Sequence, residues 1–181
     1  EGLSRPEPRS RGEVEIHEHG VRFRVDPAGG HKTGFFLDQR ENRRRLAGVA
    51  RGRRVFDGMT YTGGFAVHAA KAGAAAVRAM DLDEEAVAHA ATNAAANDVT
   101  IDFEHGDVFN ALRSYAGNPV EGRPELLIVD PPKWAKDRAG FGSAMRRYAD
   151  LNRLAIEAVA PALGERVFEG EIANIDTRVD P

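Results

Sequence analysis

Short apolar segments alternate with longer amphipathic ones from residue 54 onward, and this alternation constrains the possible fold more than any other feature. The predicted strands are 54–57, 76–80, 100–104 and 126–129, and the predicted helices are 65–72, 84–97, 108–115 and 142–160. The strand 126–129, Leu-Leu-Ile-Val, is apolar throughout, which is typical of a strand buried on both faces of a parallel sheet. The alternation therefore predicts an α/β fold with a doubly wound sheet.

The segment before residue 54 has a different character. Apolar and polar residues alternate from 14 to 25 on both sides of Gly20, which predicts a β-hairpin. Residues 38–50 predict a helix rich in arginine. Residues 1–12 are rich in Pro, Arg and Glu and predict a disordered lead-in.

Polar residues follow each predicted strand of the alternating part. They are Asp57 with the glycine turn after it, Asp81, Asp107, and the run Asp130-Pro131-Pro132-Lys133. Ligands of open parallel sheets bind beyond the carboxyl ends of the strands. We therefore expect these groups to converge on one crevice.

The glycine turn and the carboxylates after it indicate an adenosine site. Gly63 and Gly64 let the backbone approach a ligand, and the helix that follows presents free N–H groups. The turn lacks the G-x-G-x-x-G pattern, so the dinucleotide fingerprint is not met and an oxidoreductase is disfavoured. Asp81, 18 residues after Gly63, is suitably placed to accept the hydroxyls of a ribose, and Asp107 could accept from an adenine amino group. S-adenosylmethionine fits this description better than NAD.

The run from Asp130 to Trp134 is the most specific motif of the sequence. Two prolines after a buried strand make a rigid, extended turn that would hold the Asp130 side chain at the mouth of the crevice. Lys133 could meet a phosphate or a developing negative charge, and Trp134 could stack on a base. The alternative is a proline-rich loop with one exposed tryptophan.

Charge and composition limit the function further. Residues 1–54 carry a net charge of +5 from 13 basic and 8 acidic side chains, and residues 55–181 carry −8 from 12 and 20. A basic segment on an acidic remainder is typical of a nucleic-acid surface, although charge alone favours a solvated face. Cysteine is absent, which excludes a thiolate metal site within these residues, and we predict no metal. No apolar run approaches the roughly 20 residues of a membrane span, so a cytoplasmic protein that does not bind membranes is expected.

With these motifs, the sequence resembles the class I S-adenosylmethionine-dependent methyltransferases that form 5-methylcytosine in large-subunit ribosomal RNA. The resemblance covers roughly residues 12–162. The matching stretches are His31–Arg43, Tyr61–Val67, Asp107–Phe109, Asp130–Lys133 and Arg147–Asn152.

The resemblance implies a Rossmann-like methyltransferase sheet, S-adenosyl-L-methionine as cofactor, and RNA, in particular ribosomal RNA, as partner. The implied cofactor-binding residues are Phe36, Asp38, Gln39 and Arg40 in the segment Lys32–Arg43, which closes over the cofactor, together with Tyr61, Thr62, Gly63, Gly64, Asp81 and Asp107. Asp130 and Lys133 are implied to be catalytic, and the expected substrate contacts are Pro131, Pro132, Trp134, Arg43 and Arg44. Tyr148 and Asn152 either brace the site or only hydrogen-bond within the fold.

The resemblance also divides the chain. It implies a lead-in over 1–12, a hairpin and cofactor-closing segment over 13–53, the methyltransferase domain over 54–162, and a divergent polar tail over 163–181. Family members usually begin with an RNA-binding domain, and after the last predicted helix they continue into further strands and a Ser/Cys motif. These features are not found here, so we expect a sheet that is incomplete in its C-terminal half. Its open edge at 126–129 would be covered by a second copy or another partner.

The missing cysteine leaves three functional readings open. Methylation of cytosine C5 needs a thiolate that adds to the base, whereas methylation of a nitrogen needs only positioning. The chain is therefore expected to be a ribosomal RNA methyltransferase, an N-methyltransferase that needs no cysteine, or a cofactor-binding module without catalytic activity.

Overall fold

The computed structural model describes residues 12–27, 34–135 and 137–160. Four parallel strands form the central sheet in the order β5-β4-β3-β6. Their bounds are β3 Arg54–Gly58, β4 Ala76–Asp81, β5 Asp102–His105 and β6 Leu126–Val129. The predicted α/β fold with a parallel sheet is thus confirmed.

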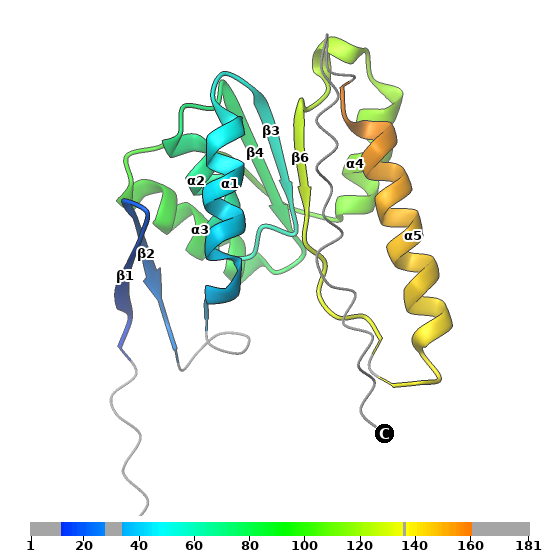
Figure 1. The fold of residues 1–181 in the computed structure, drawn as a ribbon, viewed down its shortest axis with the longest axis horizontal. Coiled ribbons are helices and arrows are strands. Elements are labelled where there is room, and N and C mark those ends of the chain that lie inside the picture. The colour runs from blue at the N-terminus through cyan, green and yellow to red at the C-terminus, as the bar shows by residue number, and fades with distance from the viewer. Residues whose placement is uncertain (1–11, 28–33, 136, 161–181) are drawn as a thin grey trace, which may run out of the picture.

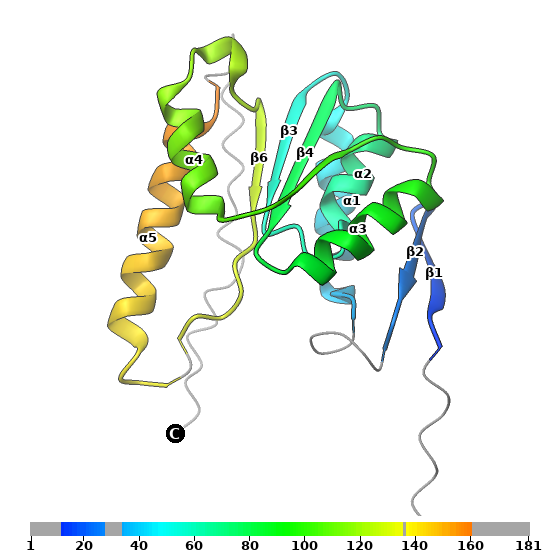
Figure 2. The ribbon, with the colours of Figure 1, turned by 180° about the vertical axis from the view of Figure 1, so that it is seen from behind.

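Helices cover both faces of this sheet (Figures 1 and 2). On one side lie α1 Arg40–Ala50, α2 Gly64–Lys71 and α3 Glu84–Ala96, and on the other lie α4 Val108–Gly117 and α5 Phe141–Ala158. Short 3-10 turns precede α1 at Leu37–Gln39 and follow α4 at Val120–Gly122. Asp83 caps α3 by accepting a hydrogen bond from the Ala86 N–H, as expected of an N-cap aspartate.

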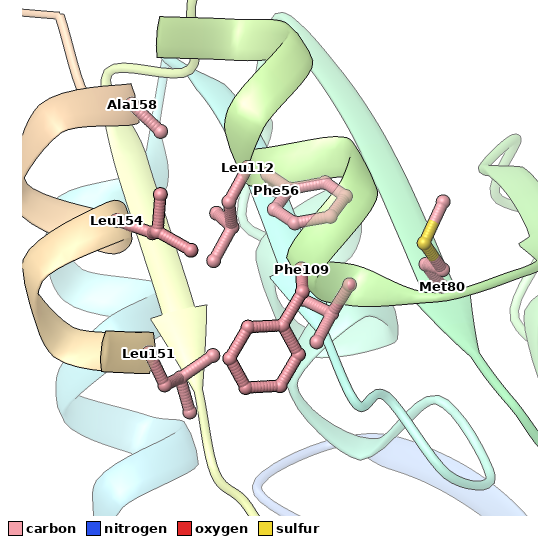
Figure 3. Close-up of a cluster of buried hydrophobic side chains, with 8 residues drawn as sticks. Phe56, Met80, Phe109, Leu112, Leu151, Leu154 and Ala158 are labelled. Atoms are coloured by element: carbon pink, nitrogen blue, oxygen red, sulfur yellow. The ribbon is translucent and has the colours of Figure 1, made fainter. Parts of the chain in front are cut away.

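Successive residues of β3 point to opposite faces and connect the two layers of helices. Phe56 packs with residues of α4 and α5, as Figure 3 shows, and Val55 packs with residues of α1 and α2. Leu112, Leu151 and Leu154 come from the two outer helices and point toward Phe56 and Phe109 (Figure 3). This cluster fixes α4 and α5 against the sheet and so positions the loop between β6 and α5.

The predicted hairpin is also present, with β1 at Val14–Glu18 and β2 at Val21–Val25. The inner face of β2 presents Val21, Phe23 and Val25, all buried, toward Val67 and Ala94. The hairpin lies beside α3, away from the central sheet (Figure 2).

Differences from the sequence prediction are confined to element ends. β5 begins at Asp102 rather than at 100, and α5 ends at Ala158 rather than at 160. The first residues of the predicted helix 38–50 form a 3-10 turn before α1. The tail 163–181 and, apart from Gly12, the lead-in lie outside the described residues.

Within the described ranges, β6 is an edge strand whose one neighbour is β3, and its four apolar residues are only half-buried. None of the helices in the described part of the chain has the length and apolar character needed to cross a bilayer.

Candidate functional site

The turn between β3 and α2, residues 58–64, lies at the carboxyl edge of the sheet and has an unusual backbone. Met59, Tyr61 and Gly63 all have positive φ, at 67°, 50° and 83°. Such a conformation costs about 1–3 kcal/mol at a non-glycine residue and persists only where the surroundings enforce it. Strain of this kind gathers at ligand sites, which makes this turn the first candidate.

Neighbouring strands hold the turn in place. The Tyr61 N–H donates to Asp81 Oδ2 at 2.8 Å, and the Thr60 N–H donates to the Met80 carbonyl at 2.9 Å. Asp81 Oδ1 accepts from the Asp83 N–H at 3.0 Å, and the Asp81 carbonyl accepts from the Gly106 N–H at 2.9 Å. The ends of β3, β4 and β5 are therefore joined, as their polar signatures predicted.

Asp57, the residue before the turn, is 1% exposed, and the sequence placed it among the strand-end residues without giving it a role of its own. Its Oδ2 accepts from the Thr60 hydroxyl at 2.6 Å and from the Ala66 N–H at 3.0 Å, so it ties the turn to the first turn of α2. Burial raises the pKa of Asp57 to about 7, although these two hydrogen bonds oppose the rise. The nearby carboxylates of Asp130 and Asp81 add to the rise in the pKa of Asp57.

The glycines of the turn allow close packing. A Cβ on Gly63 would lie 3.1 Å from the Ala90 Cβ of α3, and one on Gly64 would lie 3.1 Å from the Arg43 Cδ of α1. The first helical turn of α2 cannot satisfy its own N–H groups. Asp57 accepts from the Ala66 N–H, whereas the N–H groups of Gly64 and Phe65 have no acceptor among the described residues.

The expected closing segment meets this turn. The rings of Phe36 and Tyr61 are 5.3 Å apart, edge to face. Asp38 and Gln39 lie in the 3-10 turn before α1, and Arg40 is exposed at the start of α1. Lys32, also part of the expected segment, lies outside the described residues.

Arg43 differs from the expectation that it contacts substrate. It is 3% exposed and donates to both oxygens of Glu18, at 2.7 and 2.8 Å, and to the Phe36 carbonyl at 2.9 Å. Its guanidinium also lies over the Phe35 ring, 4.4 Å from the centroid. Arg43 therefore cannot reach RNA from this position. It joins the hairpin to the closing segment instead.

His68 of α2 completes this buried group, with Nε2 3.0 Å from Glu18 Oε1. Burial alone would raise the pKa of Glu18, but Arg43 and His68 lower it below the ordinary value. Burial lowers the pKa of His68, and Glu18 opposes that shift. These pKa shifts favour a Glu18 carboxylate paired with the Arg43 cation. They also favour a neutral His68, whose Nε2 then donates to Glu18.

The Asp130–Trp134 loop faces the same edge. Burial raises the pKa of Asp130, the carboxylate of Asp38 raises it further, and Arg43 opposes the rise. Asp38 of the closing segment and Asp130 of the loop are thus near enough to interact. Lys133 and Pro132 are exposed, and Pro131 is half-buried.

Trp134 also differs from the expected free ring. It lies 4.6 Å from the Tyr148 ring and 6.1 Å from the Phe109 ring, and the Arg147 guanidinium lies 4.3 Å from its centroid. The ring is half-buried and packs among these groups, so it supports the loop.

Tyr148 connects α5 to the loop. Its hydroxyl accepts from the Trp134 N–H at 3.0 Å and donates to the Pro132 carbonyl at 3.1 Å, so it fixes the backbone on both sides of Lys133. Asn152, by contrast, donates to the Tyr148 carbonyl within α5 and has no described contact with the loop. Of the two bracing residues considered in the sequence, Tyr148 has the contacts for that role.

The variant Tyr148→Phe tests this bracing. It leaves the Pro132 carbonyl and the Trp134 N–H without their partner, so we expect a loss of about 1–2 kcal/mol in the free energy of unfolding. Trp134 is the one tryptophan of the chain, and its fluorescence emission should shift as the loop loosens. Tyr115→Phe is the matched control, since the Tyr115 hydroxyl accepts from Arg78 and not from the loop. An emission spectrum that changes equally in both variants would contradict the bracing role.

Of the remaining residues predicted for the site, one caps a helix and another is exposed on the surface. Asp107 caps α4 by accepting from the Phe109 N–H at 2.9 Å. Arg44 is exposed and pairs with Glu41 at 2.8 Å. Among the described residues, no group of three or more His, Asp or Glu side chains is arranged to hold a metal ion.

Comparisons with known proteins agree with this geometry. Residues 6–163 match a family profile described as S-adenosylmethionine-dependent methyltransferase. The chain is 38% identical over 152 residues to ribosomal RNA large subunit methyltransferase I of Shewanella frigidimarina, and 40% identical over 151 residues to that of Aeromonas salmonicida. Each match covers 82% of this chain and 38% of the relative, so the chain spans well under half of the relatives' length.

Solved structures are similar as well. The protein SMU.776, crystallised in complex with SAH, superposes with a TM-score of 0.71 at 29% identity, over 89% of this chain and 41% of the other. A methyltransferase from Agrobacterium tumefaciens superposes with a TM-score of 0.69 over 86% of this chain and 51% of the other. At 20% identity, that second likeness concerns the fold alone.

Proposed function

This chain belongs to the S-adenosylmethionine-dependent methyltransferase family, and we propose that it binds the cofactor at the carboxyl edge of its sheet for the methylation of a base in large-subunit ribosomal RNA. The observation that carries the proposal is the joining of three strand ends to one strained glycine turn through Asp81 and Asp57. The names of the relatives, ribosomal RNA large subunit methyltransferases, support RNA as the acceptor.

The chain's own groups suit such a cofactor. Asp81 accepts one backbone N–H at each oxygen and keeps further lone pairs with which to accept ribose hydroxyls. Asp107 uses Oδ1 as a cap and could accept from the adenine amino group at its other oxygen. The N–H groups at the start of α2 suit the carboxylate of the methionine part, and the closing segment lies against Tyr61. When bound, the cofactor supplies an electrophilic methyl group on a positively charged sulfur.

The acceptor base would be positioned by the Asp130–Lys133 loop. Asp130 can orient an amino or imino group of the base, and the exposed Lys133 can meet a phosphate or a developing negative charge. The two prolines and the Tyr148 hydroxyl keep this loop rigid, so that it would hold a bound base in one position. Arg40 and Arg44, exposed on α1, are the proposed contacts to the RNA backbone.

The atom that receives the methyl group depends on cysteine. Attack from cytosine C5 requires that a thiolate first add to C6, and none of the 181 residues is cysteine. Methylation of C5 would therefore draw its thiol from outside these residues. A ring or exocyclic nitrogen attacks through its own lone pair and needs only the positioning described above.

Two measurements test the proposal. Calorimetry should detect binding of S-adenosylhomocysteine, and no binding at millimolar ligand would overturn the proposed cofactor site. Labelled methyl transfer to protein-free large-subunit RNA, followed by nucleoside analysis, identifies the acceptor. Binding without transfer would favour the alternative of a cofactor-binding module without catalytic activity.

Asp81→Ala should weaken S-adenosylhomocysteine binding by about 1–3 kcal/mol, because the ribose hydroxyls and the Tyr61 N–H lose their acceptor. Asp102→Ala is the matched control: its carboxylate lies at the start of β5, at the other end of the sheet, and is 75% exposed. Calorimetry that gives equal affinities for both variants would remove Asp81 from the site.

A further inference from the structure

Asn93 of α3 and Asn97, the residue that caps the C-terminus of α3, hold the hairpin. Asn93 and Asn97 are 1% and 3% exposed, although α3 is otherwise rich in alanine. Asn93 Oδ1 accepts from the Arg24 N–H at 2.8 Å, and Asn97 Oδ1 accepts from the Arg22 N–H at 2.9 Å. Asn97 Nδ2 donates back to the Arg22 carbonyl at 2.7 Å. The two side chains thus satisfy the edge of β2 that does not pair with β1.

The four-residue spacing of Asn93 and Asn97 explains how their side chains can bond the free edge of β2 in place of a neighbouring strand. Four residues along a helix rise about 6 Å, and two residues along a strand span about 6.6 Å. The amides of Asn93 and Asn97 therefore match successive outward N–H groups of β2. Slippage by one residue would expose Phe23 and its apolar neighbours, so the hairpin docks in one register.

Asn93 also contacts the cofactor turn, and no such contact of Asn97 is described. Asn93 Nδ2 donates to the Thr62 carbonyl at 3.0 Å, inside the strained turn. On the other side of the same peptide, the Gly63 N–H donates to the Thr60 carbonyl at 2.9 Å. Because a peptide is planar, these two bonds fix the plane between Thr62 and Gly63 and hence the left-handed φ of Gly63, from which α2 begins.

We propose that Asn93 is a positioning residue of the cofactor turn, and that through it the docking of the hairpin and the binding of cofactor stabilise each other. This inference rests on the proposed function. The hairpin is tied to the site a second time, since Glu18 at the end of β1 holds Arg43, which in turn holds the Phe36 carbonyl. Coupling between sites is reciprocal, so cofactor should tighten the hairpin by the same factor by which the hairpin tightens cofactor.

The test compares Asn93→Asp with Asn97→Asp. Each variant keeps the acceptor for β2 and loses its donor. Asn97→Asp sets a carboxylate against the Arg22 and Asn93 carbonyls, whereas Asn93→Asp sets one against the Thr62 carbonyl of the cofactor turn. We expect S-adenosylhomocysteine affinity at pH 8 to fall about ten- to hundredfold in Asn93→Asp. The loss should be clearly smaller in Asn97→Asp, which acts on the turn only through the hairpin. Urea unfolding measures the free energy of unfolding of both variants. If Asn93 had a purely structural role, the loss of affinity in each variant would follow its loss of stability.

Two further readouts separate the outcomes. Lowering the pH to about 5.5 should restore much of the affinity of Asn93→Asp relative to the parent, because burial raises the pKa of the new carboxyl and its protonated form can donate again. In the unaltered chain, S-adenosylhomocysteine should slow hydrogen exchange at the Arg24 amide. This measurement tests the coupling even if Asn93→Asp does not fold. Equal affinities of the two variants, or unchanged exchange at Arg24 in a chain that binds ligand, would overturn the inference. Absence of ligand binding by the parent would instead overturn the proposed function.

Discussion

Replacing Arg43 with alanine should lower the free energy of unfolding by about 3–5 kcal/mol, as expected when one partner of a buried ion pair is removed. The variant leaves the Glu18 carboxylate, 3% exposed, with only His68 beside it. It also removes the guanidinium from the Phe36 carbonyl and from the Phe35 ring, so packing is lost together with charge. Urea denaturation measures the effect. Affinity for S-adenosylhomocysteine should fall as well, because the closing segment loses its connection to the hairpin.

Arg44→Ala is the matched control, one position along the same helix. Arg44 is 62% exposed and pairs with Glu41 at the surface, where such pairs contribute about 0–1 kcal/mol. The cost of Arg43→Ala should also be smaller at pH 5.5 than at pH 8, since His68 can then be protonated and neutralise Glu18. The combination Arg43→Met with Glu18→Gln should recover part of the loss, because no unpaired charge stays buried. A similar cost for Arg43→Ala and Arg44→Ala would contradict the buried pair.

The comparison of these two arginines shows what the sequence could predict. Periodicity placed both on one helix, and the ends of the predicted strands located the turn, Asp81 and Asp130 correctly at one edge, because these signals are local or follow from parallel topology. Nothing local distinguishes Arg43 from Arg44. Its burial depends on Glu18, 25 residues earlier, and on how the hairpin docks.

The same reason explains the other differences. From the sequence, Trp134 is expected to be a free aromatic ring beside Lys133. In the structure it packs against Arg147 and Tyr148 of α5, which are distant in the sequence. Asn93 accepts from a backbone group 69 residues away, so its role could not be derived from α3 alone. A useful signal was present nonetheless: two asparagines four apart in an alanine-rich helix suggest side chains that replace backbone partners.

Asp57 should make the chain less stable as the pH rises. Its pKa is about 7 in the folded state, against about 3.9 in an unfolded chain, so between these values only the folded state binds the proton. Stability that depends on this proton is complete below pH 4 and is lost as the pH rises through 7. From pH 5 to pH 8 the loss from this group amounts to about 2–3 kcal/mol.

Asp57→Asn isolates this contribution, because the amide has nearly the same shape and does not titrate. Its oxygen can still accept from the Thr60 hydroxyl and the Ala66 N–H, so we expect the turn to keep its conformation. The free energy of unfolding of the variant, relative to that of the parent, should rise by about 2–3 kcal/mol between pH 5 and pH 8, measured by urea unfolding at four pH values. Groups that do not interact with Asp57, such as His68, cancel in this difference. Asp102→Asn, at a carboxylate of the same sheet that is 75% exposed, is the control variant measured at the same pH values. If the Asp57→Asn difference changes no more with pH than that of the control, Asp57 ionises near its ordinary pKa, and water or a rearranged turn must reach its carboxyl group.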